Sequence, residues 1–171
     1  MKKRKLFFNY QKEEKWINDM AKSGWHLIKY TFACYTFEKG APGEYDYCIE
    51  LLEDAPTTEK GKEYLTFMEE AGIEYVTNSA NWAYFRKKST GEPFVIYTDY
   101  MSRKKHLQRI IGLFSIILAM NLAFALYNMT IGLFSSFNFY FSILNWLVVI
   151  GLLSLIFVYL KNMQELKQDD A

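Results

Sequence analysis

The segment that decides the fold of this chain is Ile110–Leu160, whose sequence is IIGLFSIILAMNLAFALYNMTIGLFSSFNFYFSILNWLVVIGLLSLIFVYL. These 51 residues between Arg109 and Lys161 contain no Asp, Glu, Lys, Arg or His. A bilayer core about 30 Å thick needs about 20 apolar residues per helix, so the segment can hold two membrane spans. Helices are predicted because hydrocarbon offers no partner to unpaired backbone groups. We expect spans at 107–127 and 141–160. The link between them is marked by Asn128, Thr130, Gly132, Ser135, Ser136 and Asn138.

Basic residues flank the outer ends of the two spans and are absent from the link. They are Arg103, Lys104, Lys105 and Arg109 before the first span, and Lys161 and Lys167 after the second. Lys/Arg bias marks the cytoplasmic side of a membrane protein. The pattern therefore predicts a multi-pass protein of the cell membrane with both termini in the cytoplasm. The same charges attract anionic headgroups, so membrane lipid is an expected partner.

Small residues form a stripe along each predicted span. The stripe consists of Ser115, Ala119 and Ala123 on the first span, and of Gly151 and Ser154 on the second. Small side chains let membrane helices approach closely, so the stripe serves either packing within the hairpin or a homo-oligomer interface. Residues 110–160 carry no acidic side chain, basic side chain or histidine, which argues against an ion or proton pathway and favours an anchor.

The residues before the first span have the composition of a water-exposed domain. Residues 1–109 hold 18 of the 20 Lys+Arg and 16 of the 19 Asp+Glu. This nearly balanced charge argues against a nucleic-acid-binding surface. We expect a cytoplasmic domain at 1–100, a basic juxtamembrane segment at 101–109, the hairpin at 110–160 and a cytoplasmic tail at 161–171. About 100 residues suffice for one modest core.

The cytoplasmic domain combines helical and strand patterns. Apolar periodicity predicts helices at 13–23 and 59–70. Predicted strands lie at 5–9, 25–29, 32–38, 44–52, 73–77, 81–87 and 94–98. Similar residues recur at an offset of 48, namely Trp16 and Tyr64, Ile17 and Leu65, Met20 and Met68, and Gly24 and Gly72. A duplicated strand–helix–strand–strand unit explains this repeat. We expect an α+β, ferredoxin-like antiparallel sheet with both helices on one face.

A hairpin pairing Glu38 with Glu44 would place Cys34 opposite Cys48. Strand alternation would then put Tyr35, Phe37, Tyr45, Tyr47 and Ile49 on the helix-covered face. The opposite face provides a candidate binding surface, which comprises Trp82, Tyr84, Arg86, Phe94, Asp46 and Glu50. The alternative is that the membrane-proximal segment or a second copy of the chain covers this face. A register slip of one residue would exchange the two faces.

The sequence lacks the usual patterns of catalytic and metal-binding residues. The two cysteines have no CxxC spacing, and His26 and His106 have no ligand spacing suited to a metal. No glycine-rich run ends in Lys-Ser/Thr, as a phosphate loop would. We therefore expect no enzyme activity, no cofactor and no metal.

Three runs carry a resemblance to a known family. They are FEKGAPGEY at 37–45, MEEAGIEYV at 68–76 and WAYFRK at 82–87. They resemble a bacterial family, domain of unknown function 2812, common in Firmicutes, and the resemblance covers about Lys5 to Arg103. Ile73 stands where a Trp is expected. Members often carry C-terminal transmembrane helices and are often encoded beside PadR-like regulators. The resemblance implies a membrane-anchored sensor or regulatory accessory and supplies no catalytic residues.

Two functional hypotheses follow. The first is a membrane-anchored, non-enzymatic regulatory or sensor module. Its sheet face would bind a cytoplasmic partner, such as a PadR-like regulator, or a small apolar ligand. The alternative is a structural or accessory subunit of a membrane complex that uses the small-residue stripe as its interface.

Overall fold

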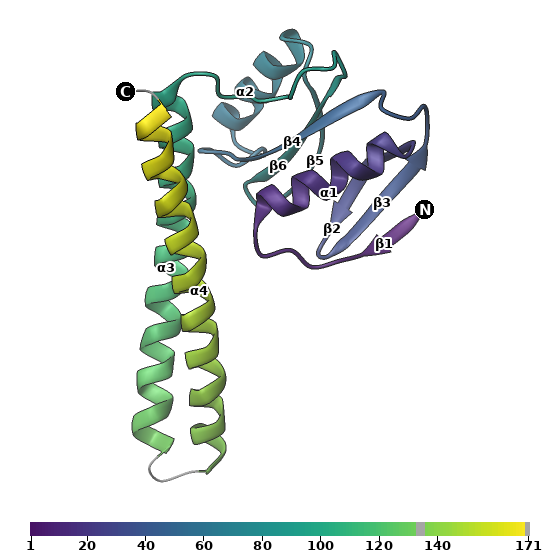
Figure 1. Cartoon of the computed structure of the whole chain (residues 1–171). Helices are drawn as coiled ribbons and strands as arrows, with labels where there is room; N and C mark the ends of the chain where they lie inside the picture. The colour runs from purple at the N-terminus through teal and green to yellow at the C-terminus, as the bar shows by residue number, and fades with distance from the viewer. Residues whose placement is uncertain (133–135, 170–171) are drawn as a thin grey trace. The chain divides into compact units, whose positions relative to one another are not determined.

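The computed structural model describes residues 1–132 and 136–169 and divides into two compact units, Met1–Thr98 and Asp99–Ala171 (Figure 1). Unit 1 contains the α+β elements and unit 2 contains two long helices. Ser135, which we assigned to the link, and the last two residues of the tail lie outside the described ranges.

Unit 1 has two helices and six strands. Their bounds are β1 Lys2–Arg4, α1 Tyr10–Lys22, β2 Trp25–Thr31, β3 Cys34–Lys39, β4 Tyr45–Leu51, α2 Glu59–Glu70, β5 Glu74–Ser79 and β6 Trp82–Lys88. Side chains cap both helices: Asn9 Oδ1 accepts from the Lys12 N–H at 3.2 Å, and Thr58 Oγ1 accepts from the Gly61 N–H at 3.1 Å. Such caps satisfy backbone donors that have no partner within the helix.

The strands form two sheets rather than the single sheet that we predicted. The first sheet has the order β1-β3-β2 and the second has the order β4-β6-β5, with all pairs antiparallel. A hydrogen bond of 3.4 Å from the Tyr30 N–H to Thr77 Oγ1 links β2 to β5. The first strand lies earlier than predicted, at Lys2–Arg4 instead of 5–9.

The predicted hairpin between β3 and β4 is wrong. Both edges of β3 are occupied, by β1 and by β2. The loop after β3 is held by the end of α1, because the Gly40 N–H donates to the Gly24 carbonyl and the Gly43 N–H to the Ala21 carbonyl, each at 3.0 Å. Cys34 and Cys48 therefore lie in different sheets.

The two halves of unit 1 share their strand order and their register. In each half the strand after the helix pairs with the next strand, as Leu27↔Phe37 and as Tyr75↔Phe85. Each pairing is then interrupted by a bulge, between Leu27 and Lys29 in one half and between Tyr75 and Thr77 in the other. The paired residues and the bulges of the two halves differ by 48 positions, the same offset that relates the sequences of the two halves.

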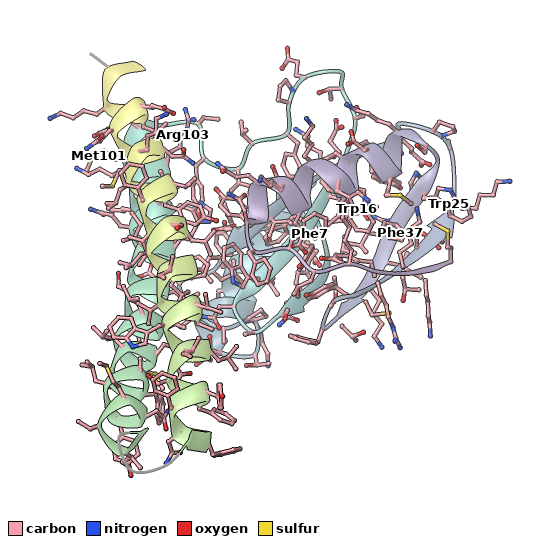
Figure 2. The ribbon with its side chains drawn as sticks, turned by 60° about the horizontal axis from the view of Figure 1, so that its bottom comes forward. Phe7, Trp16, Trp25, Phe37, Met101 and Arg103 are labelled. Atoms are coloured by element: carbon pink, nitrogen blue, oxygen red, sulfur yellow. The ribbon has the colours of Figure 1, made fainter. Side chains whose placement is uncertain are left out.

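The helices cover opposite faces of the second sheet, so the prediction that both lie on one face is wrong. The core beneath α1 contains Ile17, Met20, Ala21, Leu27, Tyr35, Phe37, Tyr47, Ile49 and Tyr84. This core thus contains residues of both sheets. Figure 2 shows Trp16 on α1 with Phe7 beside it. The core beneath α2 contains Leu52, Met68, Ala83 and Phe85. Alternation along β6 sends Tyr84 towards α1 and Phe85 towards α2.

The burial of Tyr35, Phe37, Tyr47 and Ile49 beneath α1 confirms their predicted core position. Residues 94–98 do not form the predicted strand, and the hairpin partner expected for them, β6, is paired on both sides by β4 and β5. Phe94 and Ile96 pack instead against the core beneath α2.

Unit 2 consists of α3, Tyr100–Gly132, and α4, Ser136–Asp169. Both helices are long and apolar enough to cross a membrane, and the two predicted spans lie within them. Ser142 and Val149 are buried, as are Leu152, Tyr159 and Leu166. This seven-residue spacing is typical of two helices packed as a coiled coil.

Candidate functional site

Glu13 joins the two sheets of unit 1 through a pair of tyrosines. Its Oε1 accepts from the Tyr35 hydroxyl of the first sheet at 2.7 Å and from the Tyr84 hydroxyl of the second at 2.6 Å. Tyr30 lies against both rings, with centroids 4.8 Å from Tyr35 and 5.2 Å from Tyr84. We call Glu13, Tyr30, Tyr35 and Tyr84 the glutamate clamp.

The electrostatics of the glutamate clamp suit a structural contact between the two sheets better than general-base catalysis by Glu13. Burial raises the pKa of Glu13, while the two tyrosine hydrogen bonds lower it. Burial and the neighbouring Glu13 also raise the pKa values of Tyr35 and Tyr84, so both hydroxyls stay protonated and donate. A general base must reach a substrate proton. Here Oε1 already accepts from two hydroxyls, and Tyr84 is 3% exposed.

A second carboxylate, which is buried, ties α2 and the segment after β6 to β4. Glu50 is 2% exposed and accepts from the Tyr64 hydroxyl at 2.9 Å. The Tyr97 hydroxyl donates to the other oxygen of the same carboxylate. Burial and the proximity of Glu50 raise the pKa of Tyr64, which therefore remains a donor at neutral pH. A buried carboxylate needs such charge-assisted hydrogen bonds to be tolerated.

Cys48 and His26 of unit 1 are held by their neighbours. Burial raises the pKa of the Cys48 thiol well above its usual value, and the neighbouring Glu14 raises it further, so the reactive thiolate is disfavoured. His26 Nε2 lies 2.9 Å from the Ala41 carbonyl oxygen, in hydrogen-bond contact with the loop after β3. Within residues 1–132 and 136–169, no three His, Cys, Asp or Glu residues are grouped so that they could hold a metal ion.

The six residues of the predicted binding surface do not share one open face. Trp82 and Tyr84 belong to the core beneath α1, whereas Phe94 packs in the core beneath α2 and Glu50 is buried. Asp46 is half-buried on β4. The surface is divided because each face of the second sheet is covered by its own helix.

Arg86, the remaining member of that predicted surface, is fixed by neighbours from several strands. Its Nε donates to Glu74 Oε2 at 2.7 Å, and its guanidinium lies 4.3 Å from the centre of the Tyr45 ring. A longer ion pair of 4.0 Å reaches Glu38 in the first sheet. Arg86 therefore helps to hold the two sheets together.

The most exposed aromatic side chain of α2 is Phe67, which is 62% exposed. Glu63 and Glu70 are exposed four residues before it and three residues after it, so all three lie on one side of the helix. We call Glu63, Phe67 and Glu70 the α2 surface. The helical spacing of these three residues is a signal in the sequence that could have identified this surface.

The charge of unit 1 is strongly divided along the chain. Residues 1–43 contain nine Lys/Arg and four Asp/Glu, a net charge of +5. Residues 44–98 contain five Lys/Arg and eleven Asp/Glu, a net charge of −6. The nearly balanced total, which argued against a nucleic-acid-binding surface, thus conceals one basic and one acidic half.

The predicted small-residue stripe does not pack the hairpin. All five of its members, Ser115, Ala119, Ala123, Gly151 and Ser154, are exposed on unit 2. Larger side chains, including Ile110, Val149 and Tyr159, are buried instead. Hence hairpin packing, one of the two roles considered for the stripe, is excluded.

A protein-family model matches most of this chain. The family model described as "Protein of unknown function (DUF2812)" matches residues 9–120, which run from the start of α1 into α3. No curated protein and no solved structure matches the chain. The resemblance carried by the three sequence runs is thereby confirmed. Because the match covers more than half of the 171 residues, the chain belongs to the protein family of unknown function DUF2812.

Proposed function

We propose that this protein is a membrane-anchored, non-enzymatic regulatory module whose α2 surface binds a cytoplasmic protein. The observation that carries the proposal is the exposure of Phe67 between two glutamates on α2. A partner that fits this surface has an apolar pocket bordered by basic residues. A PadR-like transcription regulator is one such candidate, since proteins that bind nucleic acid carry basic surfaces.

Comparison of the two halves of unit 1 supports this choice of surface. The offset of 48 relates Phe67 on α2 to Asp19 on α1, and both side chains are exposed. An exposed helix position is ordinarily polar, as Asp19 is. Phe67 departs from that pattern, and its burial in a partner pocket would contribute about 2 kcal/mol of binding free energy. The surrounding glutamates would steer a basic partner and disfavour acidic ones.

The anchor in this proposal is the pair α3 and α4. Their length and apolar composition suit a bilayer, and the Lys/Arg bias of the flanks favours a cell-membrane location with both termini in the cytoplasm. Unit 1 would then be held at the cytoplasmic surface as a duplicated strand–helix–strand–strand module. The shared strand order and bulge positions of its halves support an origin by duplication.

The test is copurification of the full-length tagged protein in a mild detergent, with Phe67→Ser as the variant and Thr66→Ser as the control on the same helix. Both positions are exposed, so neither change should unfold unit 1. The proposal predicts that a partner retained by the wild type and by Thr66→Ser is lost from Phe67→Ser. Equal retention by all three proteins would contradict the assignment of the α2 surface.

A second candidate function is that of an accessory subunit in a membrane complex. The exposure of Ala119 and of the other stripe residues favours it, because small exposed residues permit close approach of another helix. In that case Ala119→Ile would disrupt assembly in the membrane, including any homo-oligomer, whereas Phe67→Ser would leave assembly intact.

A further inference from the structure

The first sheet is covered by α1 on one side and carries basic residues on the other. Lys2 and Lys29 both pair with Thr36, and Arg4 pairs with Cys34, so all three basic side chains stand on the face opposite the buried Tyr35 and Phe37. Lys2, Arg4 and Lys29 are exposed. The strands of this sheet contain five Lys/Arg and a single acidic residue, Glu38.

The N-terminal segment continues this face with apolar residues. Odd-numbered residues turn towards α1: Lys3 Nζ donates to Met20 Sδ at 3.4 Å, and Phe7 lies against Trp16 with ring centroids 5.4 Å apart. The even-numbered Leu6 and Phe8 are 55% and 71% exposed. The basic strand β1 is thus followed by two apolar side chains, Leu6 and Phe8, that do not belong to the core.

The tip of the β2–β3 hairpin adds the most exposed large apolar side chain of unit 1. Phe32 is 88% exposed. The Lys5 N–H donates to the Ala33 carbonyl at 2.9 Å, so this tip lies beside the N-terminal segment. We call Lys2, Arg4, Lys29, Leu6, Phe8 and Phe32 the basic–apolar face.

We propose that the basic–apolar face docks on an anionic phospholipid bilayer. Cationic side chains beside exposed aromatic and aliphatic groups match the two layers of a membrane surface, where phosphates lie above acyl chains. Nucleic acid or an acidic protein would match the charges but would leave Phe32, Leu6 and Phe8 without an apolar environment. The same chain carries two helices that suit a bilayer, which would hold this face at high effective concentration beside the lipid.

This docking concerns a surface distinct from the α2 surface and does not depend on the proposed partner. Each cation near an anionic leaflet strengthens association about fivefold. Removing Lys2, Arg4 and Lys29 together is therefore expected to weaken docking about 100-fold. The electrostatic part of the interaction falls with added salt.

The test uses the full-length protein in nanodiscs made either of phosphatidylcholine alone or with about 30 mol% phosphatidylglycerol. An environment-sensitive fluorophore is attached at Phe32→Cys in a background that carries Cys34→Ser and Cys48→Ala. The control attaches the same fluorophore at Thr66→Cys, an exposed position on α2. Circular dichroism and tryptophan emission verify that each variant is folded.

We expect a blue shift at position 32 in anionic nanodiscs that is absent in neutral ones and absent at position 66. The combined Lys2→Gln, Arg4→Gln and Lys29→Gln variant should abolish the shift, as should about 300 mM salt. An unchanged spectrum, or equal shifts in both nanodiscs, would overturn the proposal. So would a shift in neutral nanodiscs that appears only on addition of single-stranded DNA or polyglutamate, because the face would then bind another polyanion.

Discussion

The side chain of Asn18 on α1 pairs with the backbone of Tyr47 on β4 in the manner of a neighbouring strand. Asn18 Nδ2 donates to the Tyr47 carbonyl and the Tyr47 N–H donates to Asn18 Oδ1, both at 2.8 Å. One turn earlier on α1, Glu14 Oε2 accepts from the Ile49 N–H at 2.7 Å. Strand β4 is an edge of the second sheet, and exposed edges invite pairing with other chains. Helix α1 thus closes this edge with side chains.

Replacing Asn18 should therefore destabilise unit 1. Asn18→Leu leaves the Tyr47 N–H and carbonyl without these partners, which costs about 1–3 kcal/mol of unfolding free energy. The neighbouring Asp19 is exposed, and Asp19→Leu should cost less than about 0.5 kcal/mol. Urea unfolding in detergent micelles, followed by tryptophan fluorescence, measures both. Equal stabilities of the two variants would show that the edge pairing contributes nothing.

The raised pKa of Glu13 predicts a specific pH dependence. Burial raises this pKa above its ordinary value of 4.5, so the folded state binds the proton more tightly than the unfolded state. The stability that protonated Glu13 gives is complete below pH 4.5 and is lost as the pH rises through the folded-state value. The side chain at position 13 cannot titrate in the Glu13→Gln variant, so this loss of unfolding free energy with rising pH should be missing from it. Subtracting the two pH profiles isolates the contribution, and a flat difference would contradict it.

Gly24 and Gly72 provide a matched pair for backbone strain. Both have a positive φ, of 78° and 77°, which an alanine adopts only at a cost of about 1 kcal/mol. A Cβ on Gly24 would also lie 2.9 Å from the Gly40 carbonyl oxygen, whereas a Cβ on Gly72 meets nothing within 4 Å. We expect Gly24→Ala to destabilise unit 1 by at least about 1 kcal/mol more than Gly72→Ala. A larger loss from Gly72→Ala in the same urea titration would refute this account of the turn.

Ala119 and Ala125 test the packing of α3 against α4. Ala125 is fully buried, and its carbonyl accepts from Ser142 Oγ on α4 at 3.2 Å. Ala125→Ile should overpack this contact and cost about 1–3 kcal/mol. Ala119 is exposed, so Ala119→Ile should leave the hairpin intact. Thermal melting of the helical signal in detergent distinguishes the variants, and a greater loss from Ala119→Ile would mean that the helices pack through the small-residue stripe.

Local patterns in the sequence predicted the elements better than their pairing. The helices around Ile17 and Met68 follow from apolar periodicity, and the membrane-length helices follow from a charge-free segment. The hairpin between β3 and β4 was expected because a Gly- and Pro-containing turn lies between two alternating runs. The backbone N–H groups of Gly40 and Gly43 in that turn instead donate hydrogen bonds to the end of α1. Strand alternation cannot predict this contact.

The predicted surface failed for a related reason. Alternation puts Tyr84 and Phe85 on opposite faces of β6, but it could not reveal that each face has its own helix. The carboxylates that accept from tyrosines could not be predicted either, because Glu13 and Glu50 resemble solvated glutamates until the tyrosines that donate to them are placed in space. The exposed position of Phe67, in contrast, was within reach of sequence reasoning through comparison with Asp19 in the other half.

Photocrosslinking in cells tests the central claim that the α2 surface of this membrane-anchored module binds a protein partner. Benzoylphenylalanine is placed at position 67 of the full-length chain and, as the control, at position 19, the equivalent exposed site on α1. The proposal predicts a discrete crosslinked partner in the membrane fraction from position 67 and none from position 19. The absence of a crosslink at position 67, or the same product from both positions, would contradict it.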